Sequence, residues 1–406
     1  MLTKAALTIS AQAVSSLTNF LVGAFALAVG TLGEFGHFSI ALQLCIVVIA
    51  IGQGSTGTTI LIHGAQSQSS DSDMLPGTAR AAMVTGVACA IVFVVAGLVV
   101  DGDIGRLLLI SAPGCPGLVA QYTMRSVYFA RFEYAKVVLL DTVWLVVLLV
   151  AGAAAWLASW SPGPGYFLVA WLVGGSVSAI PLFLIALRSQ RSSLRYFWQQ
   201  TGPQAVKLGV DNLLARSVLS VALVSTSIVL DDTASGSLAA ATLLFSPLTI
   251  VNASIASIVV PPEIRKRGVH VVRRSLPLMV IAATMLVTVA WAATLVLIEW
   301  LGFAAGPFRL SANEIGTGLF IATLLRFLAF AAWRGPAVGL RIADAASESL
   351  DARIRGTVLQ WVLPVVGLLL GGLSAGAMGF AIATWIGALL TWHRYVTLGQ
   401  PKAATA

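Results

Sequence analysis

Charged residues are scarce in this chain of 406 residues: Asp, Glu, Lys and Arg together make up 10%, whereas 58% of the residues are hydrophobic. An average soluble domain carries about 25% charged residues. A chain this poor in charge cannot cover a surface that faces water, so its surface must face lipid. The mean hydropathy of +0.92 agrees with this. Composition therefore predicts an integral membrane protein.

Cysteine and histidine are also rare. The three cysteines each lie inside an apolar run, and the four histidines are scattered without an H-x-x-x-H pair. This pattern gives neither a disulfide framework nor the spacing of metal ligands. The sequence also lacks the G-x-x-x-x-G-K-[ST] phosphate-binding loop. We expect no metal and no cofactor, and we exclude ATP hydrolysis by that route.

One short motif resembles a dinucleotide-binding loop. Gly52-Gln-Gly54-Ser-Thr-Gly57 matches G-x-G-x-x-G, but it ends an apolar helix and no strand precedes it. We expect these glycines to allow the close approach of a neighbouring helix instead.

Long apolar runs occupy most of the chain. A membrane-spanning helix needs about 20 mostly apolar residues. Runs of that length predict twelve spans, over residues 6–29, 36–62, 79–100, 106–126, 138–158, 166–187, 208–230, 236–261, 275–299, 314–333, 357–373 and 375–396. The first run lacks a compact hydrophobic region followed by a cleavage site, so we expect it to be retained.

The basic residues alternate between the predicted loops. All but four of the 24 lysines and arginines fall in the loops of one side, and the exceptions are Arg106, Arg309, Arg216 and Arg326. Because positive charge marks cytoplasmic loops, we predict a multi-pass protein of the cell (inner or plasma) membrane with both termini in the cytoplasm. The net charge of +8 arises in this way, and we expect no nucleic-acid partner.

The chain divides near its middle at a long basic stretch, from Arg188 to Lys207. After this stretch the pattern restarts, so that the segment beginning at Gly236 resembles the one beginning at Gly36. A parallel repeat is typical of transporters. We predict an all-α membrane protein with two six-helix lobes, 1–195 and 196–406, around a central cavity.

Charges inside the predicted spans are the strongest candidates for a site, because a charge at mid-helix costs several kcal/mol unless it faces a cavity or a partner. Arg216 and Arg326 have no acidic neighbour one helical turn away, and an arginine can bind a phosphate through paired hydrogen bonds. Asp211 could instead pair with Lys207, and Asp141 could cap its helix or pair with Lys136.

Polar side chains form a softer signal in the first two spans. Gln12 and Asn19 lie on one side of the first helix, and Gln43 and Gln53 add amides to the second. Such a face either lines a hydrophilic cavity for sugar hydroxyls or joins helices by hydrogen bonds. We leave both interpretations open.

Two further segments bear on movement. Pro113-Gly-Cys-Pro116-Gly lies inside the fourth predicted span, and this break is a candidate hinge because proline interrupts helical hydrogen bonding. The connector from Ile342 to Arg355 has apolar residues every fourth position, so it is either an amphipathic helix on the inner membrane face or a solvated linker.

Two segments resemble a known family. Phe35-Gly-His-Phe-Ser-Ile-Ala-Leu-Gln43 and the basic connector from Arg125 through Arg131 to Lys136 are similar to stretches of the polysaccharide flippases (Wzx-like) of the multidrug/oligosaccharidyl-lipid/polysaccharide exporter superfamily. The resemblance covers the layout of the whole chain.

The resemblance implies a two-lobed transporter, not an enzyme, that moves a polyprenyl-diphosphate-linked oligosaccharide to the outer leaflet by alternating access for surface polysaccharide assembly. Arg125 and Arg131 would attract the diphosphate at a cytoplasmic entrance, and Arg216 and Arg326 would bind it further in. Its partners would be the lipid-linked glycan, membrane lipids and a glycan polymerase or glycosyltransferases. The alternatives are a cation-coupled drug or small-metabolite exporter of the same superfamily and a membrane-embedded glycan-assembly enzyme.

Overall fold

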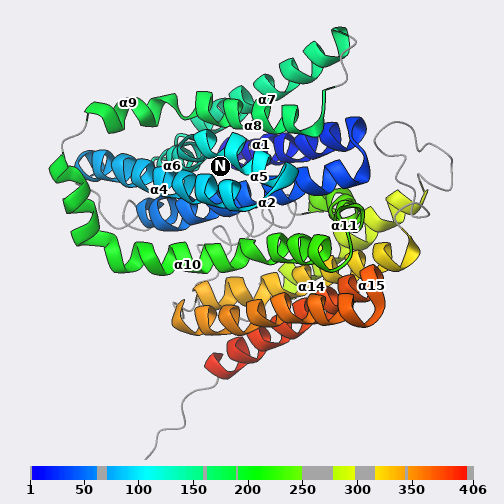
Figure 1. Cartoon of the computed structure of the whole chain (residues 1–406). Helices are drawn as coiled ribbons and strands as arrows, with labels where there is room; N and C mark the ends of the chain where they lie inside the picture. The colour runs from blue at the N-terminus through cyan, green and yellow to red at the C-terminus, as the bar shows by residue number, and fades with distance from the viewer. Residues whose placement is uncertain are drawn as a thin grey trace, which may run out of the picture. The chain divides into compact units, whose positions relative to one another are not determined.

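The computed structural model describes residues 2–61, 71–158, 162–188, 191–248, 278–297, 316–342 and 346–399, and these residues are helical apart from short connections (Figure 1). Among them, nine helices are long and apolar enough to cross a membrane, and one bent pair of helices makes a tenth candidate. The predicted all-α, multi-span membrane architecture is confirmed. The count of twelve stays a prediction, because the span expected over 236–261 is described only as far as Leu248.

The helices group into two compact units, Met1–Ser220 and Val221–Ala406. The division falls inside α10 (Arg191–Val229), which is one continuous helix. The lobe boundary predicted at 195/196 lies in the first turns of this helix. The assignment of six spans to each lobe stays a prediction.

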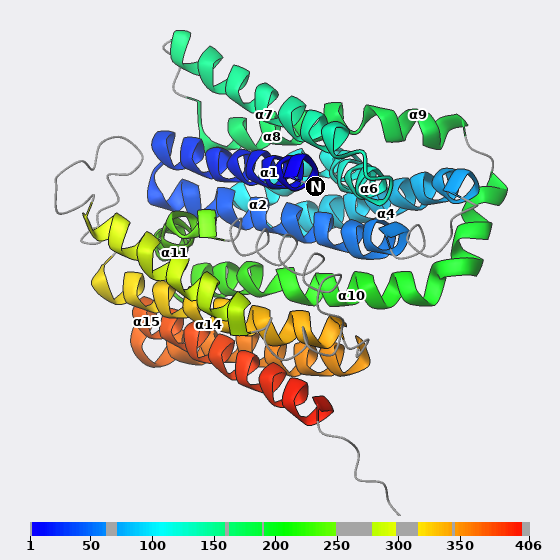
Figure 2. The ribbon, with the colours of Figure 1, turned by 180° about the vertical axis from the view of Figure 1, so that it is seen from behind.

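The first unit is a bundle in which helices distant in sequence lie side by side. α1 packs against α7 and α8, whereas α4 packs against α5, α6 and α9 (Figures 1 and 2). Its elements are α1 (Leu2–Val29), α2 (Leu32–Gly52), the π-helical turn η1 (Gln53–Thr58), α4 (Asp71–Val99), α5 (Gly102–Ser111), the 3₁₀ turn η2 (Ala112–Gly114), α6 (Cys115–Ala130), α7 (Tyr134–Leu157), α8 (Pro164–Ser178), α9 (Ile180–Arg188) and α10 as far as Ser220.

Aromatic residues fill the middle of this bundle. Trp144 of α7 and Trp171 of α8 are both buried, with ring centroids 5.0 Å apart. The indole Nε1 of Trp144 donates to the Trp171 carbonyl at 2.6 Å. A buried indole N–H needs such a partner, so this bond fixes how α7 and α8 pack together.

Local chemistry sets where helices begin and break. Thr31 and Glu34 form a capping box that starts α2 directly after α1, with the Glu34 carboxylate accepting from the Thr31 amide at 2.8 Å. The proline-rich segment forms the turn η2 between α5 and α6, so the break predicted at Pro113 and Pro116 is present. Its action as a hinge stays a prediction.

The second unit contains the end of α10, α11 (Asp232–Leu244), the helix Leu278–Leu297, α14 (Thr317–Ile342) and α15 (Ala346–Gly399). α15 is two helices divided at Gly371 and Gly372, where Gly372 has φ +69°. This region of backbone favours glycine. The buried residues Phe245, Ala292 and Phe327 join α14 to the helices before it. From Ala346 onward, the predicted connector Ile342–Arg355 is the beginning of α15.

Candidate functional site

A buried ion pair joins α6 to α7 in the first unit. The Nε atom of Arg125 lies 3.1 Å from Oδ2 of Asp141, and the two side chains are 8% and 0% exposed. Gln121 Nε2 donates to Asp141 Oδ1 at 3.0 Å, and Arg125 Nη2 donates to Gln12 Oε1 of α1 at 3.3 Å. These four residues are called the α6–α7 polar centre below.

The helical repeat explains how α6 supplies two members of this centre. Gln121 and Arg125 are four residues apart, so both lie on the face of α6 that meets Asp141. The Arg125 guanidinium also lies 5.7 Å from the ring centroid of Tyr122 and 5.5 Å from that of Phe129. A buried carboxylate and a buried guanidinium each carry a large desolvation cost, which their mutual attraction offsets only while both are present.

This geometry differs from the roles expected from the sequence. Asp141 was expected to cap its helix or to pair with Lys136, but Lys136 pairs with Glu133 at 3.0 Å and Asp141 pairs with Arg125. Arg125 was expected at a cytoplasmic entrance, which stays a prediction, and its side chain is buried in this structure. Arg131 is half-buried at the end of α6.

The polar face of α1 joins helices in at least two places. Gln12 accepts from Arg125, and the Asn19 Oδ1 atom accepts from the Trp171 indole at 3.1 Å. For these two residues the structure favours interhelical hydrogen bonding over the lining of a cavity. Gln43 and Gln53 of α2 and η1 are half-buried, and neither side chain makes a hydrogen bond within the described part of the chain.

The glycine motif at the end of α2 packs against other helices. A Cβ atom on Gly54 would lie 2.3 Å from the carbonyl oxygen of Leu208, and one on Gly57 would lie 2.6 Å from the Ser126 hydroxyl. No larger residue fits at these contacts without displacement of the backbone or a side chain. The prediction of close helix approach at this motif is confirmed.

The second unit holds its arginine differently. The Arg326 guanidinium lies 3.9 Å from the ring centroid of Phe380 and 5.7 Å from that of Phe327. Its Nη1 atom donates to the Thr242 hydroxyl at 3.5 Å. Among the residues that the structure describes, no carboxylate forms an ion pair with Arg326. The side chain is half-buried between α14, α11 and α15.

The remaining predicted residues lie on α10. Arg216 is exposed and Asp211 is half-buried. Arg216 belongs to the first unit and Arg326 to the second, so neither unit by itself contains both arginines.

Two contact residues escaped the sequence analysis. Gln121 carries a recoverable signal, since it precedes Arg125 by four residues on the same helix. Phe380 carries none, because a phenylalanine in an apolar span resembles any other core residue until the fold brings it to Arg326.

Comparisons with known proteins bear on the fold. No family model matches the chain, and no curated protein matches its sequence. Among solved structures, the chain is similar to an inward-facing multidrug resistance MATE family transporter of the MOP superfamily, at 15% identity and a TM-score of 0.71, covering 96% of each chain.

Two further structures give the same result. A MOP superfamily transporter from Pyrococcus furiosus, in which the reverse polarity of the binding pocket suggests a different function, matches at 14% identity and a TM-score of 0.69 over 98% of this chain and 95% of that one. The lipid II flippase MurJ in an inward closed conformation matches at 13% identity and a TM-score of 0.68, over 98% and 88%. The protein is therefore a multi-pass membrane protein with the fold of MOP superfamily transporters.

Proposed function

We propose that this protein is a transporter that flips a polyprenyl-diphosphate-linked oligosaccharide to the outer leaflet, by alternating access, for surface polysaccharide assembly. The observation that carries the proposal is Arg326, a half-buried cation in a membrane-spanning helix whose described surroundings are aromatic rings and a hydroxyl. A cation in this position is stabilised when an anion reaches it.

A diphosphate suits such a residue chemically. The guanidinium presents several N–H donors in a rigid plane, which match two oxygens of one phosphate. Its contact with Phe380, 3.9 Å from the ring centroid, attracts the charge without supplying an oxygen acceptor for the N–H groups. Arg216, exposed on α10 in the first unit, is a separate candidate cation for the same cargo. Gln43 and Gln53 are the amides assigned to the sugar hydroxyls, since the hydrogen bonds of Gln12 and Asn19 already join helices.

One observation favours a second candidate, the cation-coupled exporter. Asp141 is a buried carboxylate within the first unit, and such a group can take up a proton or another cation during a transport cycle. Arg125 already neutralises Asp141 in this conformation, so the exporter hypothesis requires that the ion pair separate at another stage of the cycle.

The test is mass spectrometry of polyprenyl-linked glycans, together with analysis of surface polysaccharide, in cells depleted of this protein. Wild-type protein should restore the surface polymer, whereas Arg326→Gln at equal abundance should leave a completed lipid-linked unit accumulated. Arg355→Gln is the matched control, because Arg355 is an exposed arginine of the same unit. Normal surface glycan in the depleted cells, or full restoration by a variant that carries both Arg216→Ala and Arg326→Ala, would overturn the proposal.

A further inference from the structure

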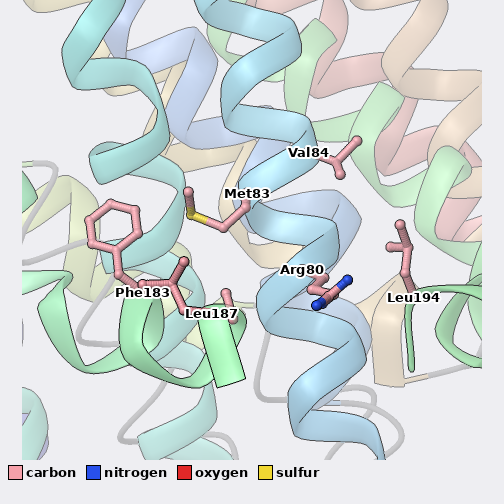
Figure 3. Close-up of a pocket in the computed structure, with 7 residues that line it drawn as sticks. Arg80, Met83, Val84, Phe183, Leu187 and Leu194 are labelled. Atoms are coloured by element: carbon pink, nitrogen blue, oxygen red, sulfur yellow. The ribbon is translucent and has the colours of Figure 1, made fainter. Parts of the chain in front are cut away.

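The start of α10 borders an apolar pocket of about 390 Å³ in the first unit. Figure 3 shows Leu194 of α10, Met83 of α4 and Phe183 of α9 among the residues that line it. Arg80 is the one charged residue among these lining residues, and it already has an interaction partner. This end of α10 therefore presents hydrocarbon, and the polar side chains that bear on the cargo lie further along the helix.

Asn212 and Arg216 lie on one face of α10, because they are four residues apart in a continuous helix. Asn212 is half-buried and Arg216 is exposed. Among the residues that the structure describes, neither side chain makes a hydrogen bond or an ion pair. Asp211, the residue before Asn212, already has an interaction partner and forms no ion pair with Arg216. The amide and the guanidinium are therefore both open to a ligand.

The Asn212 amide lies against the π-helical turn η1. A Cβ atom on Gly54 of this turn would lie 2.8 Å from the Nδ2 atom of Asn212. Glycine at position 54 therefore leaves the space that the amide occupies. π-Helical turns occur frequently at functional sites. The contact fixes where the amide lies, at the place where α10 crosses η1.

Both side chains belong to a membrane-spanning segment, Leu194–Val229. The span predicted over 208–230 places Arg216 about 12 Å beyond its start, at 1.5 Å per residue. A guanidinium at that depth is costly unless it faces a cavity or a partner, and an amide without a hydrogen bond adds a further cost. A ligand with an anionic group beside a hydroxyl group satisfies both side chains at once.

We propose that Asn212 and Arg216 bind the junction between the diphosphate and the first sugar of the cargo, an inference that rests on the proposed function. Arg216 donates to a phosphate oxygen, and Asn212 binds a hydroxyl of the first sugar. The Cβ atoms of two residues one helical turn apart are separated by about 5–6 Å. This spacing suits the junction, because a single oxygen joins the sugar ring to the phosphate.

The two residues have different tasks at this junction. A guanidinium only donates hydrogen bonds and attracts any polyprenyl diphosphate, whether or not it carries a sugar. An amide both donates and accepts, as a sugar hydroxyl does. Asn212 is therefore the specificity-determining residue, which distinguishes the loaded carrier from the empty one.

The experiment is native mass spectrometry of the purified full-length protein in a mild detergent. Polyprenyl diphosphate competes with the same lipid carrying N-acetylglucosamine or galactose, and phosphatidylglycerol is the reference lipid. Wild-type protein should retain at least one sugar-bearing carrier in preference to the empty carrier. Asn212→Ala should reduce that preference about fivefold. The ratio of two ligands on one variant is insensitive to a general loss of stability.

Arg216→Gln should lower the retention of the loaded and the empty carrier alike, by about tenfold. Arg195→Gln is the matched control, because Arg195 is another exposed arginine of α10. An unchanged sugar preference in Asn212→Ala, no preference in wild-type protein, or unchanged retention in Arg216→Gln would overturn this inference alone. Retention of neither carrier above phosphatidylglycerol by wild-type protein would overturn the proposed function together with it.

Discussion

The two units hold an arginine inside the membrane in two different ways. In the first unit, Arg125 lies 3.1 Å from the carboxylate of Asp141 and donates to Gln12. In the second, Arg326 lies 3.9 Å from the ring centroid of Phe380 and donates to Thr242. The first arrangement neutralises the charge, whereas the second solvates the guanidinium and leaves its charge in place within the described residues.

The two arrangements have different consequences: one bears on the stability of the fold, and the other on affinity for a ligand. An ion pair with no net charge does not attract an external anion. It stabilises the fold only while each buried charge has its partner to offset the cost of desolvation. A cation on an aromatic face gains little by comparison, about 0.5–2 kcal/mol, and keeps its attraction for an anion. The comparison therefore predicts that α6–α7 substitutions act mainly on folding and that Arg326 substitutions act mainly on binding.

The largest effect is expected for Asp141→Asn. This change leaves Arg125 buried without its counter-charge, which should lower the free energy of unfolding by about 3–5 kcal/mol. Denaturant unfolding of the purified protein in detergent measures it. A loss below 1 kcal/mol would show that the pair is better solvated than its 8% and 0% exposure implies.

A double variant sharpens this result. Arg125→Met combined with Asp141→Leu removes both charges, so its stability should return to within about 2 kcal/mol of wild type. If the double variant is as unstable as Asp141→Asn alone, the loss comes from packing and not from an unpaired charge.

An intermediate effect is expected at Phe380. In a double-mutant cycle of Phe380→Leu and Arg326→Gln, the coupling energy should be about 0.5–2 kcal/mol, because the guanidinium lies over the ring. The same unfolding measurement, made on the two single variants and the double variant, gives this energy. A coupling energy near zero would contradict the conclusion that the Phe380 ring stabilises the Arg326 guanidinium.

The smallest effect is expected for Arg355→Gln. Arg355 pairs with Asp351 at 3.1 Å, but the two side chains are 59% and 40% exposed. Water screens such a pair, so the change should cost no more than about 1 kcal/mol, and added salt should reduce even that. Asp351 also retains Arg394 at 2.8 Å. A loss comparable to that of Asp141→Asn would mean that exposure does not control the strength of these ion pairs.

The sequence predicted the helices well because the required length of an apolar run is set by the thickness of the bilayer. The span predicted over 138–158 is α7 (Tyr134–Leu157), and the one over 36–62 is α2 together with η1. The break between the last two predicted spans was expected at residue 374 and lies two to three residues earlier, at Gly371 and Gly372. Glycine and proline carry this information locally, through the backbone conformations they favour or prevent.

The site was less accessible to sequence reasoning. An unusual charge in an apolar run identifies Asp141 and Arg326 as residues of interest, but not their partners. Arg125 reaches Asp141 across the α6–α7 turn, and Phe380 reaches Arg326 from a different helix. Those contacts depend on helix rotation and packing, which hydrophobic periodicity leaves undetermined in a helix that is apolar on all sides.

The break at Gly371 and Gly372 has a consequence for membrane insertion. The two helices of α15 are joined by a turn of two glycines, and no charged residue lies between Arg355 and Arg394. The backbone groups freed at the turn need water, so the turn must reach the membrane surface and not stop in the hydrocarbon. Because the connection is so short, the second helix cannot stay in the aqueous phase while the first helix inserts into the bilayer. We therefore expect the last two predicted spans to enter the bilayer together, as a helical hairpin.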